Sequence, residues 1–89
     1  MSIIHKKCWP QEFDALLSGS KQFDLRLHDF EIQVGDTLVL EEWGPLTKTY
    51  TGRTIEKKVT YLLPFKTDTL PYWSEDDIHT HGLVIMSLS

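Results

Sequence analysis

The strongest constraint on the fold of this chain is a series of short segments in which apolar and polar residues alternate. In the segment from Lys21 to Leu27, the apolar side chains fall on one side of an extended backbone, while Asp24 and Arg26 fall on the other. The same alternation occurs in residues 30–34, 37–43 and 50–63. Gly, Pro and Asp residues typical of turns separate these segments. The pattern predicts β-strands that each bury one face.

The two ends of the chain add further predicted strands. Residues Ile3 to Cys8 form a short first strand, and residues 82–88 form a last strand that is apolar on both faces, as in the centre of a sheet. Within 50–63, Gly52 predicts a bulge. One face of that segment is predicted to consist of Ile55, Val59, Tyr61 and Leu63. Residues 66–81 are predicted to form a polar loop.

One segment near the N-terminus has the features of a short helix. Pro10 suits the first turn of a helix, and Gly19 suits its end because glycine adopts a positive φ at little cost. The apolar stripe between them consists of Phe13, Leu16 and Leu17. A helix of two to three turns is too short to be stable alone in water, so it must pack on the sheet.

These elements predict a mixed α+β fold that is mainly β. Short strands need a closed or stacked sheet to bury one face and limit open edges. We therefore expect a small β-barrel of five to six strands with one short N-terminal helix closing one end, formed by residues 1–89 as a single domain.

Charge and composition exclude several classes of protein. The chain has 9 Lys and Arg residues against 13 Asp and Glu residues, a net charge of −4, which disfavours nonspecific binding of duplex nucleic acid. The sequence still allows a local basic cleft, because basic residues cluster around positions 5–7, 21–26 and 53–58. No apolar stretch approaches the roughly 20 residues of a membrane-spanning helix. With no predicted secretory signal and a single cysteine, Cys8, the expected location is the cytoplasm.

The predicted strand from Lys21 to Leu27 contains the main candidate site. Asp24 and Arg26 share one face, about 7 Å apart along the strand, and Lys21 can reach the same space with its long side chain. Arg26 offers a planar fork of donors, and Asp24 can accept a hydrogen bond or act as a base. Composition and spacing alone favour a surface ion pair over a binding site here.

A family resemblance shifts this balance. The shared positions near the N-terminus are His5, Lys7, Pro10, Phe13, Leu17 and Gly19. With Lys21-x-x-Asp24-x-Arg26, Val34-Gly35-Asp36, Glu42-Trp43 and Tyr50-Thr51-Gly52-Arg53, they resemble the ASCH domain of the PUA-like superfamily, and more closely a small uncharacterised bacterial and phage branch of it. The resemblance implies a compact β-barrel with a cleft beside the Lys21 to Arg26 signature, and RNA binding as the function.

The resemblance also implies an alternative activity. Some ASCH relatives are small amidohydrolases that remove an acyl group from modified cytidine nucleosides, which makes Lys21 and Asp24 catalytic candidates. The chain departs from the pattern in having Asp24 where the broader signature has Glu. A hydroxyl nucleophile does not carry over, because no Ser or Thr stands near Asp24 and Ser20 precedes Lys21.

Three functions therefore remain open at this point. The first is a module that binds RNA or a nucleotide; its binding residues are Lys7, Lys21, Asp24, Arg26 and Trp73. The second is the amidohydrolase, and the third is a protein-interaction module of a phage or mobile element. In the third, the acidic residues 75–77 with Tyr72 and Trp73 contact a basic partner.

Metal and thiol chemistry receive little support. The potential ligands are His5, Cys8, His28, His79 and His81, with His79 and His81 predicted on one strand face. No Cys-x-x-Cys or His-Glu-x-x-His spacing occurs, so we expect no metal and no cofactor. Cys8 in a predicted strand is expected to be a buried structural thiol rather than a nucleophile.

Overall fold

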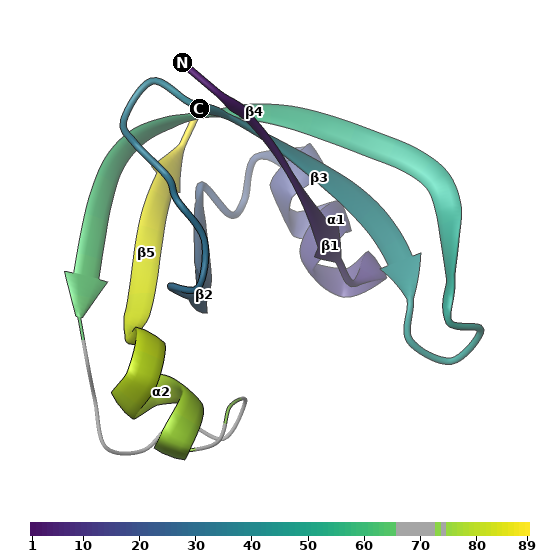
Figure 1. The fold of residues 1–89 in the computed structure, drawn as a ribbon. Helices are drawn as coiled ribbons and strands as arrows, with labels where there is room; N and C mark the ends of the chain where they lie inside the picture. Colours follow the sequence, from purple (N-terminus) through teal and green to yellow (C-terminus); the bar gives the residue numbers. More distant parts are fainter. Residues whose placement is uncertain (66–72, 74) are drawn as a thin grey trace.

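A computed structural model describes residues 1–65, 73 and 75–89, without the side chains of Glu75 and His79. Figure 1 shows the order of elements along the chain. They are β1 (Ile3–Cys8), α1 (Pro10–Ser18), β2 (Phe23–Leu27), β3 (Thr37–Gly44), β4 (Thr49–Phe65), α2 (Glu75–His81) and β5 (Leu83–Leu88). The predicted mixed α+β class and the predicted N-terminal helix are confirmed. None of the helices in this described part is long or apolar enough to cross a membrane.

The five strands form one sheet in the order β1-β3-β4-β5-β2. β1 runs parallel to β3, and the other neighbours are antiparallel. β4 is 17 residues long and pairs with β3 along its first half and with β5 along its second half. In Figure 1 it arches over the molecule, so the sheet folds back towards itself.

Two irregularities in the pairing of β4 allow this curvature. The register shifts between Glu41 and Trp43 opposite the predicted bulge glycine, Gly52, which has a φ of 93°. The register shifts again between Val59 and Tyr61. The predicted single apolar face of β4 is therefore wrong, because the second bulge turns Tyr61 and Leu63 away from the buried Val59.

β1 and β2 are the edge strands of this curved sheet. They are not neighbours in the sheet order, so backbone pairing between described strands does not close a barrel. A side chain spans the opening instead, because the Arg26 guanidinium donates from Nη2 to the Lys7 carbonyl oxygen at 2.7 Å. The two edges are thus held together at one point.

The core fills the inside of the curve. Its buried members are Cys8, Phe13, Leu16, Ile32, Leu38, Leu40, Val59, Val84, Met86 and Leu88. α1 contributes Phe13 and Leu16, two positions of the predicted apolar stripe, and ends at Gly19, whose φ is 85° and whose N–H donates to the Leu16 carbonyl oxygen.

Two predicted segments have a different structure. Residues 30–34 were expected to be a strand but form a loop. Within this loop, only Ile32 has less than a tenth of its surface exposed. The loop is held by Asp36, whose carboxylate accepts hydrogen bonds from the backbone N–H groups of Ser2 and Gln33, both at 2.8 Å. These side-chain bonds, one of them to the distant Ser2, replace a strand ladder.

The predicted loop at 66–81 is also partly wrong, because its last part is the helix α2. Ile78 is buried in this helix with 1% of its surface exposed, which anchors it next to β5. His79 and His81 therefore belong to a helix and not to the strand face that their spacing predicted.

Candidate functional site

β2 buries the face that the sequence pattern placed outside. Asp24 is 5% exposed, whereas Phe23, on the opposite face, is 49% exposed. The alternation was thus predicted correctly, but the assignment of the apolar face to the interior is wrong for this strand. The reason is that Asp24 and Arg26 project into the opening between β2 and β1, where each finds a polar partner.

Asp24 and Arg26 form a close ion pair within β2. The Arg26 Nε lies 2.5 Å from Asp24 Oδ2, and the side chains are 21% and 7% exposed. Because Arg26 also donates to the Lys7 carbonyl oxygen, its guanidinium links the carboxylate of one edge strand to the backbone of the other. The pair is therefore largely buried and is not the surface pair that spacing alone favoured.

Lys21 joins this group from the turn after α1. Its backbone N–H donates to the Ala15 carbonyl oxygen at 3.0 Å, which fixes the turn, and its ammonium group pairs with Glu12 of α1. The lysine side chain is only 18% exposed. Its ammonium also lies 5.1 Å from the centre of the Phe23 ring.

The electrostatics show that these groups form one cluster. Burial raises the pKa of Asp24, while the charges of Arg26 and Lys21 lower it and that of Glu12 raises it. The pKa of the Cys8 thiol is raised to about 11, mainly by burial and then by Asp24. The structure thus brings together three of the predicted residues, Lys21, Asp24 and Arg26, with Glu12 as a fourth member that the sequence pattern did not single out. We call these four residues the ion cluster.

The side chain of Lys7 points to a different neighbourhood. Its ammonium lies 4.5 Å from the centre of the Trp43 ring and 6.0 Å from that of Tyr50. Trp43 and Tyr50 are cross-strand partners at the end of the β3–β4 hairpin, and Tyr50 is 53% exposed. We call Lys7, Trp43 and Tyr50 the aromatic platform. The sequence analysis assigned neither Trp43 nor Tyr50 to the binding site, although their positions on either side of one turn were the available signal.

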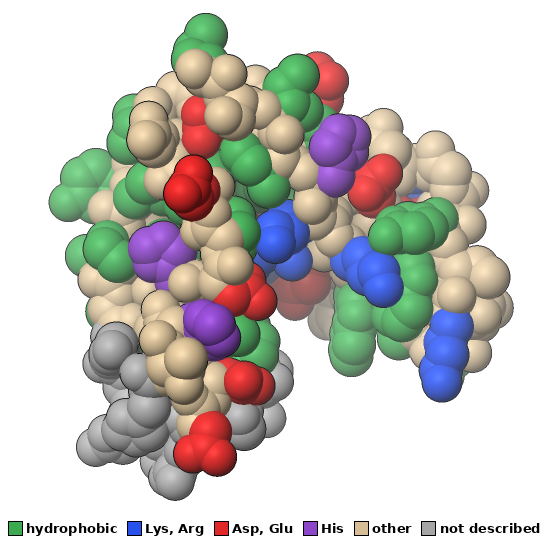
Figure 2. Space-filling view, in the orientation of Figure 1, with side chains coloured by type: hydrophobic (Ala, Val, Ile, Leu, Met, Phe, Trp, Pro, Cys, Tyr) green, Lys and Arg blue, Asp and Glu red, His purple; other side chains and the backbone are tan. Residues whose placement is uncertain are grey.

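Lys7 connects the two parts of the site. Its backbone carbonyl accepts from the ion cluster through Arg26, and its side chain belongs to the aromatic platform. Figure 2 shows that the surface is hollowed between the β3–β4 hairpin and the rest of the molecule, with basic, acidic and hydrophobic side chains along its walls.

A further buried carboxylate lies where the hairpin meets α1. Glu42, 4% exposed, accepts from Arg53 Nη2 at 2.7 Å and from the Thr51 hydroxyl at 2.6 Å. Arg53 also bonds to Asp14 of α1 at 2.9 Å. The bonds from Arg53 and Thr51 lower the pKa of Glu42 to about 2. This arrangement pairs the buried Glu42 carboxylate and fastens the hairpin to the helix. The sequence analysis missed it; the Thr51-Gly52-Arg53 bulge was the available signal.

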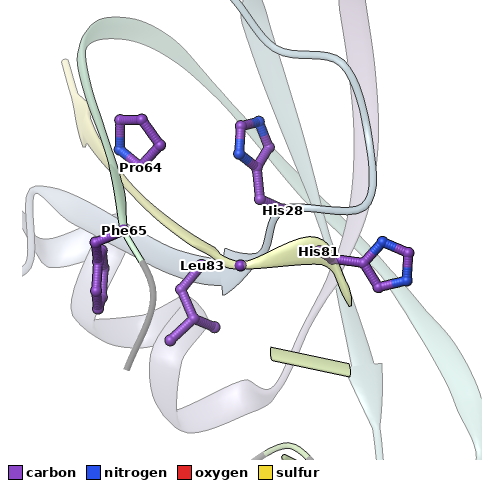
Figure 3. A pocket seen from close by; sticks show the side chains of 6 residues that line it. His28, Pro64, Phe65, His81 and Leu83 are labelled. Atoms are coloured by element: carbon purple, nitrogen blue, oxygen red, sulfur yellow. The ribbon is translucent and has the colours of Figure 1, made fainter. Parts of the chain in front are cut away.

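A separate open hollow of about 290 Å³ lies at the other end of β2 and β5. Figure 3 shows its lining side chains, with the His28 and His81 rings pointing in different directions. The complete lining is His28, Pro64, Phe65, His81, Gly82 and Leu83. It does not include any of the predicted site residues.

The remaining predicted residues are less fully placed. Trp73 is half-buried in a bend. Tyr72 and the side chain of Glu75 lie outside the described residues, whereas Asp76 and Asp77 of the predicted partner-binding segment are exposed on α2. Among the side chains that the structure does describe, no group of three His, Cys, Asp or Glu residues is arranged to hold a metal ion.

Comparison with known proteins finds a matching family model, a phage relative and a solved structure of similar fold. A protein-family model described as "Domain of unknown function (DUF3850)" matches residues 4–74. The chain is 35% identical over 85 residues to the "Uncharacterized 12.9 kDa protein in GpA 3'region" of Escherichia phage P2, which covers 94% of this chain and 72% of the phage protein. It is also similar in fold to the crystal structure of hypothetical protein PH0355, with a TM-score of 0.74 and 14% identity over 100% of this chain and 98% of the other.

Proposed function

The chain belongs to the family described as Domain of unknown function (DUF3850), and we propose that it binds RNA or a nucleotide where the ion cluster meets the aromatic platform. We also propose that the family is a branch of the ASCH domains in the PUA-like superfamily. The Lys21-x-x-Asp24-x-Arg26 signature supports that placement, as does a curved mixed sheet with a short helix after its first strand.

The observation that supports binding most directly is the junction at Lys7. One residue links a cluster of partly buried hydrogen-bonding groups to a pair of aromatic rings. Aromatic rings stack on nucleobases whatever the base, at about 1–3 kcal/mol per base. Fixed donors and acceptors then read the polar edges of a base.

The charge of the ion cluster indicates which part of a nucleotide it contacts. Lys21 and Arg26 are balanced by Glu12 and Asp24, so the cluster has no formal net charge and attracts a phosphate weakly. An arginine has five N–H donors, and Arg26 uses two of them in the contacts described above. We therefore assign the base edge to the ion cluster, and the backbone phosphate to Lys7 on the platform. Trp73 is a further candidate for stacking.

Titration of single-stranded RNA oligonucleotides and of single nucleotides tests this proposal. We expect Trp43→Ala to weaken binding by about 5- to 150-fold, the range that one lost stacking contact gives. Lys21→Ala is expected to weaken it by at least about tenfold, because a charge-assisted hydrogen bond is lost. Lys58→Ala is the matched control, since Lys58 pairs with Thr37 at the far end of the same two strands, and it should leave affinity unchanged.

Two results would contradict the proposal. Absence of binding to every RNA and nucleotide at millimolar concentration excludes the function. Equal affinity in wild type, Trp43→Ala and Lys21→Ala places binding at another surface.

The raised pKa of Asp24 supports a second candidate function, the hydrolysis of acylated cytidine nucleosides. A buried carboxyl group whose pKa is raised, in a cluster with a lysine, suits general acid–base catalysis. In this reaction, Asp24 takes a proton from water as the oxygen attacks the acyl carbon, and Lys21 stabilises the carbonyl oxygen. The C–N bond then breaks, and the returned proton leaves with the amino group of cytidine.

Incubation with acetylated cytidine separates the two functions. Chromatography should detect cytidine and acetate in the wild type, with loss of product in Asp24→Asn and Lys21→Ala and full product in Lys58→Ala. Product that does not depend on Lys21 and Asp24 excludes this mechanism.

A further inference from the structure

The second half of the sheet has an apolar outer face. Residues that pair across β4, β5 and β2 lie on the same face in successive rows. The three rows are Tyr61–Ser87–Phe23, Leu63–Ile85–Leu25 and Phe65–Leu83–Leu27. Eight of these nine side chains are aromatic or aliphatic, the ninth is a serine, and none is charged.

This face is directed away from the core. The residues adjacent to it along the strands, among them Asp24, Leu62, Val84 and Met86, belong to the interior or to the ion cluster. α1 lies inside the curve of the sheet in Figure 1. In the row nearest to α2, Leu83 has no exposed surface, while Leu27 and Phe65 are partly exposed.

The other two rows are open to solvent in the described structure. Phe23, Tyr61 and Leu63 are 49%, 62% and 49% exposed, and Leu25 and Ile85 are partly exposed. An antiparallel sheet normally has one apolar face and one polar face, so a second apolar face needs a reason. These five side chains, which we call the outer patch, expose on the order of 400 Å², more than scattered surface residues account for.

We propose that the outer patch is the interface of a symmetric homodimer. A two-fold interface places the same surface on both partners, so a charged surface would repel its own copy. The outer patch contains no charge, although the chain has a net charge of −4. A neutral, apolar sheet face is thus suited to contact a second copy of itself.

The size of the outer patch is consistent with contact to a second copy of the chain. A standard interface buries about 800 Å² on each partner, with an apolar centre and a polar rim. The outer patch, on the order of 400 Å², would form the apolar centre of such an interface, and the surrounding surface would form its rim. Two such sheets would stack about 10 Å apart, as in a β-sandwich.

Measurement of the molar mass in solution tests the dimer. Light scattering after size exclusion, from about 1 μM to about 1 mM, should give twice the 10.4 kDa of the chain at high concentration. Leu63→Glu should shift the equilibrium to monomer by about 100-fold or more, because it places an unpaired carboxylate in each half of the apolar centre. Leu46→Glu is the matched control, because Leu46 is 97% exposed at the tip of the hairpin, and it should keep the wild-type mass.

Cross-linking gives a second, independent measurement. A two-fold axis through the centre of the patch places Ile85 opposite its own copy, and the native Cys8 is buried and unreactive. Ile85→Cys should therefore cross-link through a short bis-maleimide, whereas Leu46→Cys should not. The spacing of stacked sheets exceeds the reach of a disulfide, so a spacer is required.

Each result decides for or against the dimer. Loss of the dimer in Leu63→Glu and in Tyr61→Lys, with retention in Leu46→Glu, supports it. A monomeric wild type at every concentration overturns it, and so does a dimer that survives Leu63→Glu. Circular dichroism confirms that each variant is folded, so a mass change reports association.

Discussion

The two partners of the Asp24–Arg26 pair are expected to respond very differently to substitution. Arg26→Met leaves the Asp24 carboxylate, 7% exposed, without its guanidinium, and breaking a buried pair from this side costs about 3–5 kcal/mol. Of this, about 1 kcal/mol is the lost hydrogen bond to the Lys7 carbonyl oxygen. Asp24→Asn removes the charge that is costly to bury, while Arg26 keeps 21% exposure and its bond to Lys7. We expect that change to alter the free energy of unfolding by about 1 kcal/mol or less.

The cost of Arg26→Met should also depend on pH in a defined direction. Folding raises the pKa of Asp24 through burial, so folding favours the protonated carboxyl group. The associated stability is present below the ordinary pKa of 3.8 and is lost as the pH rises through the raised value. Removing Arg26 raises the pKa further, so the loss of unfolding free energy in the variant should be larger at pH 7 than at low pH. Near pH 3 it should fall to about 1 kcal/mol, the part due to the bond to Lys7.

Urea unfolding of the wild type and of both variants, across this pH range, measures these differences. Comparison with the wild type at each pH cancels the titration of other groups. A shift of one pKa unit between the folded and unfolded states corresponds to about 1.4 kcal/mol in the free energy of unfolding. If Asp24→Asn lost as much unfolding free energy as Arg26→Met, the reasoning would be refuted, since the charges of the pair would then stabilise the fold. If the loss of unfolding free energy in Arg26→Met grew towards low pH, the direction assigned to the Asp24 pKa shift would be wrong.

Three further predictions concern residues around the site. Cys8, whose pKa is about 11 in the fold, should react with iodoacetamide at pH 8 far more slowly in the native than in the urea-unfolded chain, and equal rates would contradict its burial. Glu42→Gln should lower the free energy of unfolding at neutral pH but not near pH 2. The pKa of Glu42 is lowered from its ordinary 4.5 to about 2, so the stability that the carboxylate contributes is lost as the pH falls through this range. A difference between the two unfolding curves that stays constant with pH would argue against this. Met86→Ala should cost about 2–5 kcal/mol, because this side chain has no exposed surface, whereas Leu46→Ala should change stability by about 0.5 kcal/mol or less in the same melt.

Local patterns predicted much of the secondary structure. The bounds of β1 match the prediction, and α1 begins at Pro10 and ends before Gly19 for the expected reasons. The bulge at Gly52 was also predictable, because a positive φ is cheap only for glycine. Each of these features depends on residues that are close in the sequence.

Predictions that depended on distant partners were less successful. The segment 30–34 alternates like a strand, but Asp36 bonds to Ser2 and Gln33 and holds it as a loop. The grouping of Lys21, Asp24 and Arg26 was predictable, whereas the pairing of Lys21 with Glu12 required the turn after α1 to place them together.

The sequence by itself determined that β2 has two chemically distinct faces, since alternation follows from the geometry of an extended chain. Only the tertiary structure decided that the face with Asp24 and Arg26 is buried and the face with Phe23 is exposed. The physical reason is that β1 and β2 are the two edges of a sheet that curves back on itself. Across the opening, the Lys7 carbonyl oxygen accepts a hydrogen bond from Arg26, and the charge of Lys21 lowers the pKa of the buried Asp24.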